Sequence, residues 1–419
     1  MRRVVVTGLG FVSSIGNSRA AVLESLREMR TGVAVMPELD AYDARVKLAG
    51  TVKGFQFPTP DPLDWIFPDS LKLSRTQLRT MTPNAVYAAV AMEEAILDAR
   101  LADAQISHPQ TGLYCSAGGS PWMAHAALDA VLNRGPMRTS AATVMTGMPN
   151  ALHLNLCARF SIKGSTLGFS SACASSAHAL GAACDLIRSG RQKIMFVAGS
   201  DDCNVCNILP FAALRVLSAQ SDPALAPRAF DAARDGFVVT GGGAVLVLED
   251  AEHAAARGAR AYAEIRGWGQ ASDGYHTVAP DPTGDGLARA MSAGLADAGI
   301  SAGDVDYINA HATGTTAGDV AEINAIKSVF RPTKVPFVSS TKSLTGHGLS
   351  LAGALEAGIC CLAIHEKFMP VSANITQLDA ACDGVPVITQ PIADQPRVAL
   401  SNSSGFGGSN VSLVLSVIR

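Results

Sequence analysis

Two kinds of hydrophobic pattern alternate along the chain. Short continuous apolar runs are typical of buried strands, and longer segments with apolar positions on one face are typical of helices. We expect strands at residues 2–7, 111–116, 194–198, 244–248, 261–269, 305–309, 337–338, 397–401 and 411–418. We expect helices at residues 19–30, 83–100, 122–133, 139–158, 177–188, 285–298, 318–330 and 348–366.

The order of these elements predicts the fold class. Strands alternate with helices in both halves of the chain, residues 1–250 and 251–419, which favours parallel-type sheets covered by helices. The halves have a similar element order, so we expect a duplicated α/β unit. No hinge-like linker separates them, and we therefore expect one compact body. Residues 32–80 are punctuated by prolines and are expected to be irregular.

Composition and charge exclude several classes of function. The chain has 419 residues, 48% of them hydrophobic, which is enough to bury a large core. The net charge is −3 and no basic block is present, so we expect no nucleic-acid binding. We also expect no membrane span, because the richest apolar segment, residues 349–364, is interrupted by Glu356. The first apolar run is too short for a signal peptide, and a cytoplasmic location is expected.

The cysteines and the first glycines indicate no resident metal or nucleotide. Nine cysteines, an odd number, are typical of a reducing compartment. Cys203 and Cys206 form a C-x-x-C pair without a second pair or a nearby histidine, so we expect no metal site. Gly8 and Gly10 follow the first strand, where a loop would begin. Ser13 occupies the third position of a dinucleotide motif, which argues against a nucleotide cofactor.

Cys173 is the strongest candidate nucleophile. A short apolar segment ends at Phe169, a run of small residues follows, and a helical pattern then continues to Arg188. The thiol is therefore predicted at a strand-to-helix junction, where the helix N-terminus would lower its pKa and small neighbours would leave room for a thioester. The alternative is a buried structural cysteine.

Three further motifs lie at predicted strand ends or in a glycine loop. Residues 309–319 contain His311, residues 340–348 contain Lys342 and His347, and residues 401–410 are rich in glycine and serine. Function concentrates in such places. Either histidine alone could be structural. Two histidines with Cys173 and a glycine loop indicate a catalytic set.

Together these motifs resemble the β-ketoacyl-acyl carrier protein synthase family. The motifs are S-A-C-A-S around Cys173, H-A-T-G-T from His311, K-S-L-T-G-H ending at His347, and G-F-G-G-S-N from Gly405. The resemblance covers nearly the whole chain and is closest to the elongating synthases, since initiating synthases carry Asn where His347 stands. It implies the thiolase-like fold: duplicated α/β halves, with mixed sheets layered between helices.

The resemblance also implies a chemistry. Cys173 would take an acyl group from a thioester. A malonyl thioester would then lose CO2, and ring N–H groups of His311 and His347 would stabilise the enolate. Backbone N–H groups of Cys173 and Phe406 would stabilise the tetrahedral oxyanion. Gly405 and Gly407 would let the loop backbone approach closely.

Several supporting roles follow from the same resemblance. Lys342 is expected to pair with Glu322 or Asp319 and so to order both histidines, or to be a plain buried ion pair. Thr313 and Thr315 are expected to hydrogen-bond the pantetheine arm, or to be strand-end caps.

The implied partner is acyl carrier protein, an acidic protein that needs a basic docking surface. Arg75 with Arg79 and Arg134 with Arg138 form two candidate patches. The resemblance implies a homodimer, or a heterodimer with another ketosynthase subunit. It implies no cofactor, because the phosphopantetheine arm arrives on the carrier protein.

One position departs from the family pattern. Most elongating synthases have phenylalanine, which is thought to gate the acyl pocket, where this chain has Ser404. Our hypothesis is that serine admits a rigid, polar or conjugated acyl chain, as in a polyene or aryl polyene pathway. Housekeeping fatty-acid synthesis remains the other possibility.

Two other functions stay open at this point. The first is a non-catalytic chain-length factor, although such proteins usually lack the nucleophilic cysteine. The second is an acyltransferase or hydrolase that uses Cys173 without condensation, although hydrolysis needs no second histidine.

Overall fold

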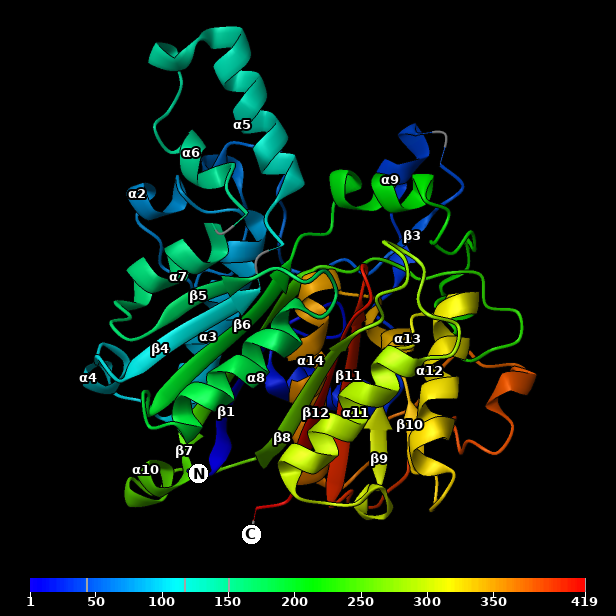
Figure 1. Ribbon diagram of the computed structural model, residues 1–419. Helices are drawn as coiled ribbons and strands as arrows, with labels where there is room; N and C mark the ends of the chain where they lie inside the picture. The colour runs from blue at the N-terminus through cyan, green and yellow to red at the C-terminus, as the bar shows by residue number, and fades with distance from the viewer. Residues whose placement is uncertain (43, 117, 150, 419) are drawn as a thin grey trace.

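The computed structural model describes every residue except 43, 117, 150 and 419. Its main feature is a ten-stranded mixed sheet, in the order β10-β9-β11-β12-β8-β1-β7-β6-β4-β5 (Figure 1). The strands of this sheet are β1 Val4–Val12, β4 Thr111–Ser116, β5 Thr166–Phe169, β6 Ile194–Asp201, β7 Gly242–Asp250, β8 Ala263–Ser272, β9 Tyr307–Asn309, β10 Phe337–Ser339, β11 Val398–Gly405 and β12 Ser409–Ser416. Two further strands, β2 Ala34–Val35 and β3 Leu48–Ala49, form a separate small sheet.

Helices separate and cover the strands. They are α1 Arg19–Arg27, α2 Arg75–Leu78, α3 Pro83–Ala99, α4 Asp103–Ile106, α5 Pro121–Arg134, α6 Thr143–Thr146, α7 Ala151–Phe160, α8 Ser175–Arg188, α9 Val205–Ala213, α10 Ala251–Ala256, α11 Asp285–Ala298, α12 Thr316–Phe330, α13 Lys342–Thr345 and α14 Ala352–Glu366. The predicted helix over residues 139–158 is two helices, α6 and α7.

The two halves of the chain repeat one strand pattern. In the first half β4 pairs in parallel with β5 and β6, and β7 pairs antiparallel with β6 and β1. In the second half β9 pairs in parallel with β10 and β11, and β12 pairs antiparallel with β11 and β8. The duplicated, mixed α/β fold is therefore confirmed. The predicted parallel pairing is correct only for the outer strands of the sheet. The sequence could not show the antiparallel pairs, because a buried strand has the same apolar pattern whichever way it runs.

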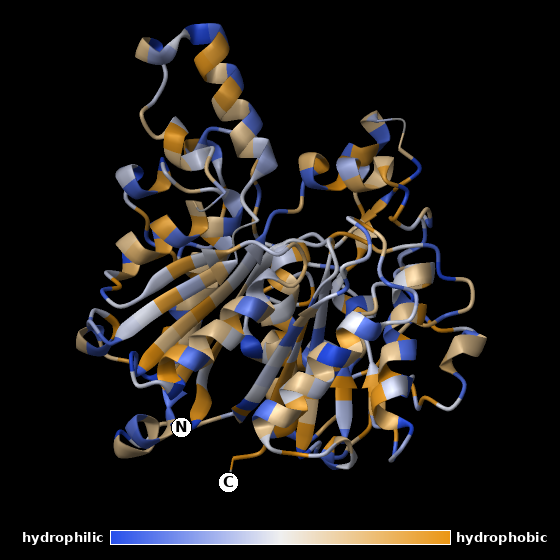
Figure 2. Cartoon of the chain, in the orientation of Figure 1, coloured by the Kyte–Doolittle hydropathy of each residue, from blue (hydrophilic) through white to orange (hydrophobic). Residues whose placement is uncertain are grey.

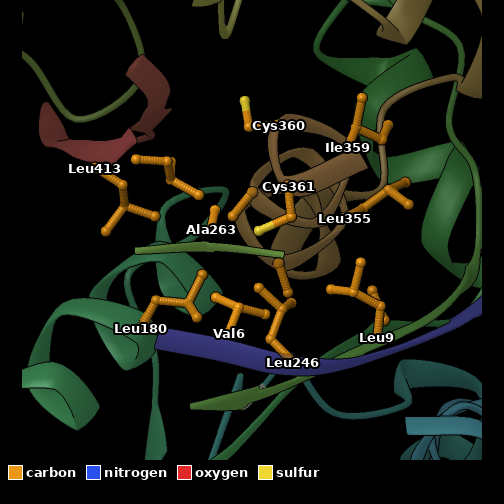
Figure 3. Close-up of a cluster of buried hydrophobic side chains, with 14 of the residues drawn as sticks. Val6, Leu9, Leu180, Leu246, Ala263, Leu355, Ile359, Cys360, Cys361 and Leu413 are labelled. Carbon is orange, nitrogen blue, oxygen red and sulfur yellow. The ribbon is translucent and has the colours of Figure 1, made fainter. Parts of the chain in front are cut away.

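The duplication places two helices at the centre of the molecule. Helix α3 covers β1 and β7, and α11 covers β8 and β12. Helices α8 and α14 pack on each other, and α14 contacts both β7 and β11. Figure 3 shows this centre, where Val6, Leu180, Leu355 and Leu413 converge from β1, α8, α14 and β12. The central helices are thus enclosed by both halves.

Helix α14 explains the most apolar part of the sequence. The segment Leu349–Glu366 is long and apolar enough to cross a membrane, but 89% of it is buried inside the protein. The charged residue in its middle, Glu356, is only 2% exposed. This segment is therefore a core helix, and its apolar run reflects contact with protein on every side.

The first strand differs from its prediction. Strand β1 continues through Gly8 and Gly10 to Val12, where the sequence predicted a loop. A Cβ atom on Gly10 would lie 1.8 Å from the Ala91 carbonyl oxygen of α3, and one on Gly8 would lie 2.4 Å from that of Ala95. These glycines therefore serve the close packing of α3 on the sheet.

One helical lobe projects from the compact body. Helix α5 extends beyond the rest of the molecule and α6 packs beside it (Figure 1), and Figure 2 shows apolar positions on α5. Leu128, Leu132 and Met137 in this lobe are exposed. Isolated apolar residues are common on surfaces, but a group of them on one projecting element indicates a contact surface.

We expect Gly10→Ala to lower the free energy of unfolding by at least about 3 kcal/mol, because the added methyl would force α3 away from β1. Gly303→Ala is the matched control. A Cβ atom there would have no neighbour closer than 3.8 Å, so a change of only about 0.5 kcal/mol is expected. Denaturant unfolding measures both. Equal effects of the two substitutions would contradict the close-packing role.

Candidate active site

Cys173 lies in the turn between β5 and α8, as the sequence predicted. The preceding residue, Ala172, has a φ of 49°, a left-handed conformation that a residue with a side chain rarely adopts. Ser175 holds the turn, because its Oγ accepts a hydrogen bond from the Ser171 N–H at 2.9 Å and donates to the Ala172 carbonyl at 2.6 Å. The strained turn fixes the position of the thiol just before the helix.

The two histidines meet this thiol from the other half of the chain. His311 follows β9 directly, and His347 follows α13. His347 Nε2 lies 3.0 Å from Cys173 Sγ, and the two imidazole rings are 5.2 Å apart, nearly perpendicular. All three residues are at most 9% exposed. The structure thus brings together Cys173, His311 and His347.

Local contacts hold each histidine. Glu322 of α12 accepts hydrogen bonds from the backbone N–H groups of His311 and Ala312, at 3.0 and 2.6 Å, and from the Asn402 amide. His347 donates its backbone N–H to the Val238 carbonyl at 2.7 Å, and its ring packs edge-on against Phe237. Both strand-end loops are therefore anchored by buried groups.

The predicted partner of Lys342 is wrong. The Lys342 ammonium pairs with Glu356 of α14, and not with Glu322 or Asp319. Both partners are almost fully buried. Asp319 instead accepts hydrogen bonds from the backbone N–H groups of Phe230 and Gly314. The pattern around Lys342 could not identify Glu356, although a charge in the middle of an apolar helix was a signal that it had a partner.

The predicted effect on the Cys173 thiol is also wrong. Burial raises the pKa of Cys173 to about 12, although the nearby Lys342 charge lowers it. Burial also lowers the pKa of His311 and His347 well below the ordinary histidine range, and Lys342 acts in the same direction. At neutral pH the free site therefore holds a thiol and two uncharged imidazoles. Desolvation outweighs the helix N-terminus here.

The tautomers of both histidines remain free to change. Among the described residues, Nδ1 of His311 and Nδ1 of His347 are buried and have no hydrogen-bond partner. A partner at Nδ1 normally fixes which ring nitrogen carries the proton. Without it, Nε2 can accept a proton in one step and donate a hydrogen bond in another.

The glycine loop lies against the nucleophile. A Cβ atom on Gly405 would lie 2.5 Å from the Ser171 carbonyl oxygen and 3.2 Å from the Cys173 backbone nitrogen. Any side chain would therefore separate the loop from the Cys173 turn. The Phe406 ring is 36% exposed and lies 6.1 Å from the Phe211 ring, so the loop also brings an aromatic group to the site.

A mainly apolar cavity of about 440 Å³ connects these groups to the outside. Thr313 and Thr315 line it, and their hydroxyl groups are 3.2 Å apart. Ser404 lines it as well, and its hydroxyl donates to Asn410 Oδ1 at 2.7 Å. A cavity of this size, with few polar groups near a nucleophile, suits a thioester on a long arm.

Some predicted site residues lie elsewhere. Asp319 and Lys342 do not line this cavity, so they support the site from behind and do not face a substrate. Arg75 and Arg79 are exposed at α2, and Arg134 and Arg138 are exposed at the end of α5. The sequence analysis missed Glu356, Asn402 and Phe237, whose roles depend on contacts between distant segments.

The raised pKa predicts a specific pH dependence of alkylation. Because the thiolate reacts and the thiol does not, the rate at which iodoacetamide modifies Cys173 should rise about tenfold per pH unit from pH 7 to pH 10. A simple thiol, with a pKa of about 8.5, should level off within this range and serves as the control. Mass spectrometry of the Cys173 peptide gives the rate. A plateau below pH 8 would mean that the helix N-terminus dominates after all.

Comparison with known proteins agrees with this geometry. Residues 1–254 match the family model for the beta-ketoacyl synthase N-terminal domain, and residues 262–376 match that for the C-terminal domain. The chain is 41% identical to 3-oxoacyl-[acyl-carrier-protein] synthase 1 of Haemophilus influenzae, over 99% of this chain and 98% of the relative. It is 39% identical to the synthase 1 of Escherichia coli, over the full length of both.

Solved structures show the same likeness. A beta-ketoacyl synthase from Burkholderia phymatum superposes with a TM-score of 0.90 at 36% identity, and the ishigamide ketosynthase/chain length factor with 0.89 at 30%, each over the full length of both chains. With the family models, the relatives and the Cys-His-His arrangement in agreement, the chain belongs to the β-ketoacyl synthase family.

Proposed function

We propose that this protein is a 3-oxoacyl-[acyl carrier protein] synthase, which condenses a Cys173-bound acyl chain with a malonyl thioester. The observation that carries the proposal is the contact between Cys173 Sγ and His347 Nε2, 3.0 Å long, with the His311 ring beside it in one buried cavity. A nucleophile is needed for the first half of this reaction, acyl transfer, and two uncharged hydrogen-bond donors are needed for the second half, decarboxylation and carbon–carbon bond formation.

The first half transfers the acyl chain. Cys173 sulfur attacks the carbonyl carbon of the incoming thioester, and the bond to the pantetheine sulfur breaks. The thiol proton passes to His347 Nε2 and from there to the departing sulfur, which leaves as a thiol. This route suits a cysteine that is neutral at rest, because charge develops only as the acyl group arrives.

The second half forms the carbon–carbon bond. The malonyl carboxylate leaves as CO2, and its bonding electrons form an enolate whose oxygen lies near His311 and His347. Uncharged imidazoles donate hydrogen bonds to this oxyanion without protonating the carbon. The enolate then attacks the acyl carbonyl, and Cys173 leaves as a thiolate that regains a proton from solvent. Loss of CO2 makes a general base unnecessary.

Backbone groups are proposed to stabilise the tetrahedral intermediate. The N–H groups of Cys173 and Phe406 lie on the two segments that Gly405 allows to approach. Fixed backbone donors in a dry site stabilise a developing oxyanion more than water does. Thr313 and Thr315 are proposed to hold the pantetheine arm, since their hydroxyl groups line the cavity.

The other two functions fit less well. The residues of a condensing site are all present, whereas a chain-length factor needs none of them. A hydrolase would need only one histidine beside the nucleophile, whereas two histidines lie beside Cys173 here.

We also propose the partners. The acyl and malonyl groups arrive on acyl carrier protein, with Arg75, Arg79, Arg134 and Arg138 as docking candidates, and no resident cofactor takes part. A dimer, with itself or with another ketosynthase subunit, is proposed from two features. Strand β5 is one of the two outer strands of the sheet, and the α5–α6 lobe exposes Leu128 and Leu132. The proposed location is the cytoplasm.

Acyl loading followed by condensation tests the function. The purified protein is mixed with acyl carrier proteins that bear saturated, unsaturated or polyenoyl chains, and malonyl-carrier protein is added second. We expect an acyl mass on Cys173 and then a chain two carbons longer, with one CO2 released per extension. His347→Asn should lower the extension rate by at least about a hundredfold, because the enolate loses a donor.

Each step has its own control. Cys173→Ser should carry no acyl mass, which places the acyl group. Loading without CO2 release would indicate an acyltransferase and contradict the condensation. No loading by any chain, with or without a second ketosynthase subunit, would contradict the proposal altogether.

A second prediction concerns the substrate and Ser404. Housekeeping elongation is favoured by the synthase 1 relatives, whereas serine at position 404 leaves room beside Phe406 for a rigid or conjugated chain. If Ser404 serves to admit a rigid or conjugated acyl chain, the Ser404→Phe substitution should lower kcat/KM for polyenoyl substrates at least about tenfold more than for saturated ones.

The Ser404→Ala variant is the control that separates the effect of the small side chain at position 404 from the effect of its hydrogen bond. It removes the bond to Asn410 but keeps the space, so the preference for one chain over another should stay as in the wild type. A uniform loss with all substrates in Ser404→Phe would mean that the residue does not select the chain.

A further inference from the structure

We propose that Cys173, His311 and His347 also form a reversible, inhibitory binding site for a zinc-class divalent cation. Cys173 Sγ and one ring nitrogen from each histidine all lie within 4.8 Å of one another. The inference goes beyond the proposed condensation, because metal binding requires only the three side chains and no acyl transfer.

The ligand set matches the preferences of zinc. Zinc binds thiolate sulfur at about 2.3 Å and imidazole nitrogen at about 2.0–2.1 Å, and sites with three protein ligands keep a fourth, open position. In a tetrahedral site those bond lengths place neighbouring ligand atoms about 3.3–3.6 Å apart. Sγ and His347 Nε2 are 3.0 Å apart, and all three ligand atoms lie within 4.8 Å of one another, so side-chain rotations that shorten the longest separation by up to about 1.5 Å would close the site around an ion.

The histidines are available as ligands. A neutral imidazole binds a metal ion through a ring-nitrogen lone pair without losing a proton, and His347 Nε2 already faces Cys173 Sγ. Only Cys173 must release one. Binding therefore replaces the thiol proton by the metal: Cys–SH plus Zn²⁺ gives Cys–S–Zn⁺ plus H⁺. The cavity supplies a path for the ion, and Asp273 and Asp281 lie along its wall.

The surroundings favour inhibition over a permanent cofactor. Ligating histidines in resident metal sites usually donate the other ring nitrogen to a carboxylate or carbonyl. Here Nδ1 of both histidines has no such partner among the described residues, and the positive charge of Lys342 acts on all three ligand residues. Both features weaken binding, which makes it reversible. The bound ion would occupy the sulfur that must take the acyl chain, so metal and acyl group exclude each other.

Cobalt provides a direct reading of this site. Co²⁺ is added alone to the metal-free full-length protein under reducing conditions, and the sulfur-to-cobalt charge-transfer band in the near ultraviolet is recorded. We expect a band that saturates near one ion per chain, is displaced by Zn²⁺, and is accompanied by release of one proton. Cys173→Ser should abolish the band, and His347→Asn should weaken binding at least about tenfold.

The controls separate this site from adventitious metal binding. The double variant His125→Asn with Cys206→Ser removes a more accessible histidine and cysteine and should bind as the wild type does. Wild-type protein alkylated at Cys173 should give no band, which covers the case in which Cys173→Ser does not fold. A band that survives either change at Cys173, or the absence of any band, would overturn the proposal.

The outcome is independent of the proposed function. Acyl loading without metal tests the condensation, whereas the cobalt spectrum tests the ion site. We expect Zn²⁺ to suppress acyl loading at the concentrations at which it displaces Co²⁺, and a chelator to restore it. Full loading in the presence of saturating Zn²⁺ would refute inhibition.

Discussion

The buried ion pair between Lys342 and Glu356 is the interaction on which the site depends. Taking two charges out of water costs several kcal/mol per ion, and only a close partner offsets that cost. Burial raises the pKa of Glu356 to about 7, and the Lys342 charge opposes this rise and so favours the carboxylate. The pair joins the short helix before His347 to the central helix α14. The Lys342 cation thereby fixes the local geometry. It adds to the effect of burial, which keeps both histidines uncharged, and it eases formation of the Cys173 thiolate.

The duplicated fold explains how three distant residues meet. In the first half Cys173 lies between β5 and α8, and in the second half His347 lies between β10 and α14. Helices α8 and α14 occupy equivalent positions and pack on each other at the centre of the molecule. The nucleophile and one histidine therefore come from corresponding strand-to-helix junctions that the duplication brings face to face. His311 comes from the end of β9, the neighbour of β10 in the sheet.

The sequence predicts what depends on short segments. The strand-to-helix position of Cys173, the strand end before His311 and most helices follow from local pattern, because a few adjacent residues determine them. It does not predict the partner of Lys342, because the choice among three buried carboxylates depends on how α14 packs. The direction of the Cys173 pKa shift was not predicted for the same reason, since the burial of the thiol depends on residues from both halves. The path of β1 through Gly8 and Gly10 was hidden because glycine permits both a turn and close packing.

Burial also protects Cys173 from side reactions while it still allows acyl transfer. A thiolate in water would react with oxidants and electrophiles at any time, whereas a thiol with a raised pKa is inert until a partner accepts its proton. His347 is such a partner, but its own lowered pKa makes it a poor resting base, so the proton moves only when a thioester carbonyl can accept the sulfur. A soft metal ion satisfies the same condition, because it too replaces the proton. Desolvation thus restricts Cys173 to reagents that bond to sulfur as the proton leaves.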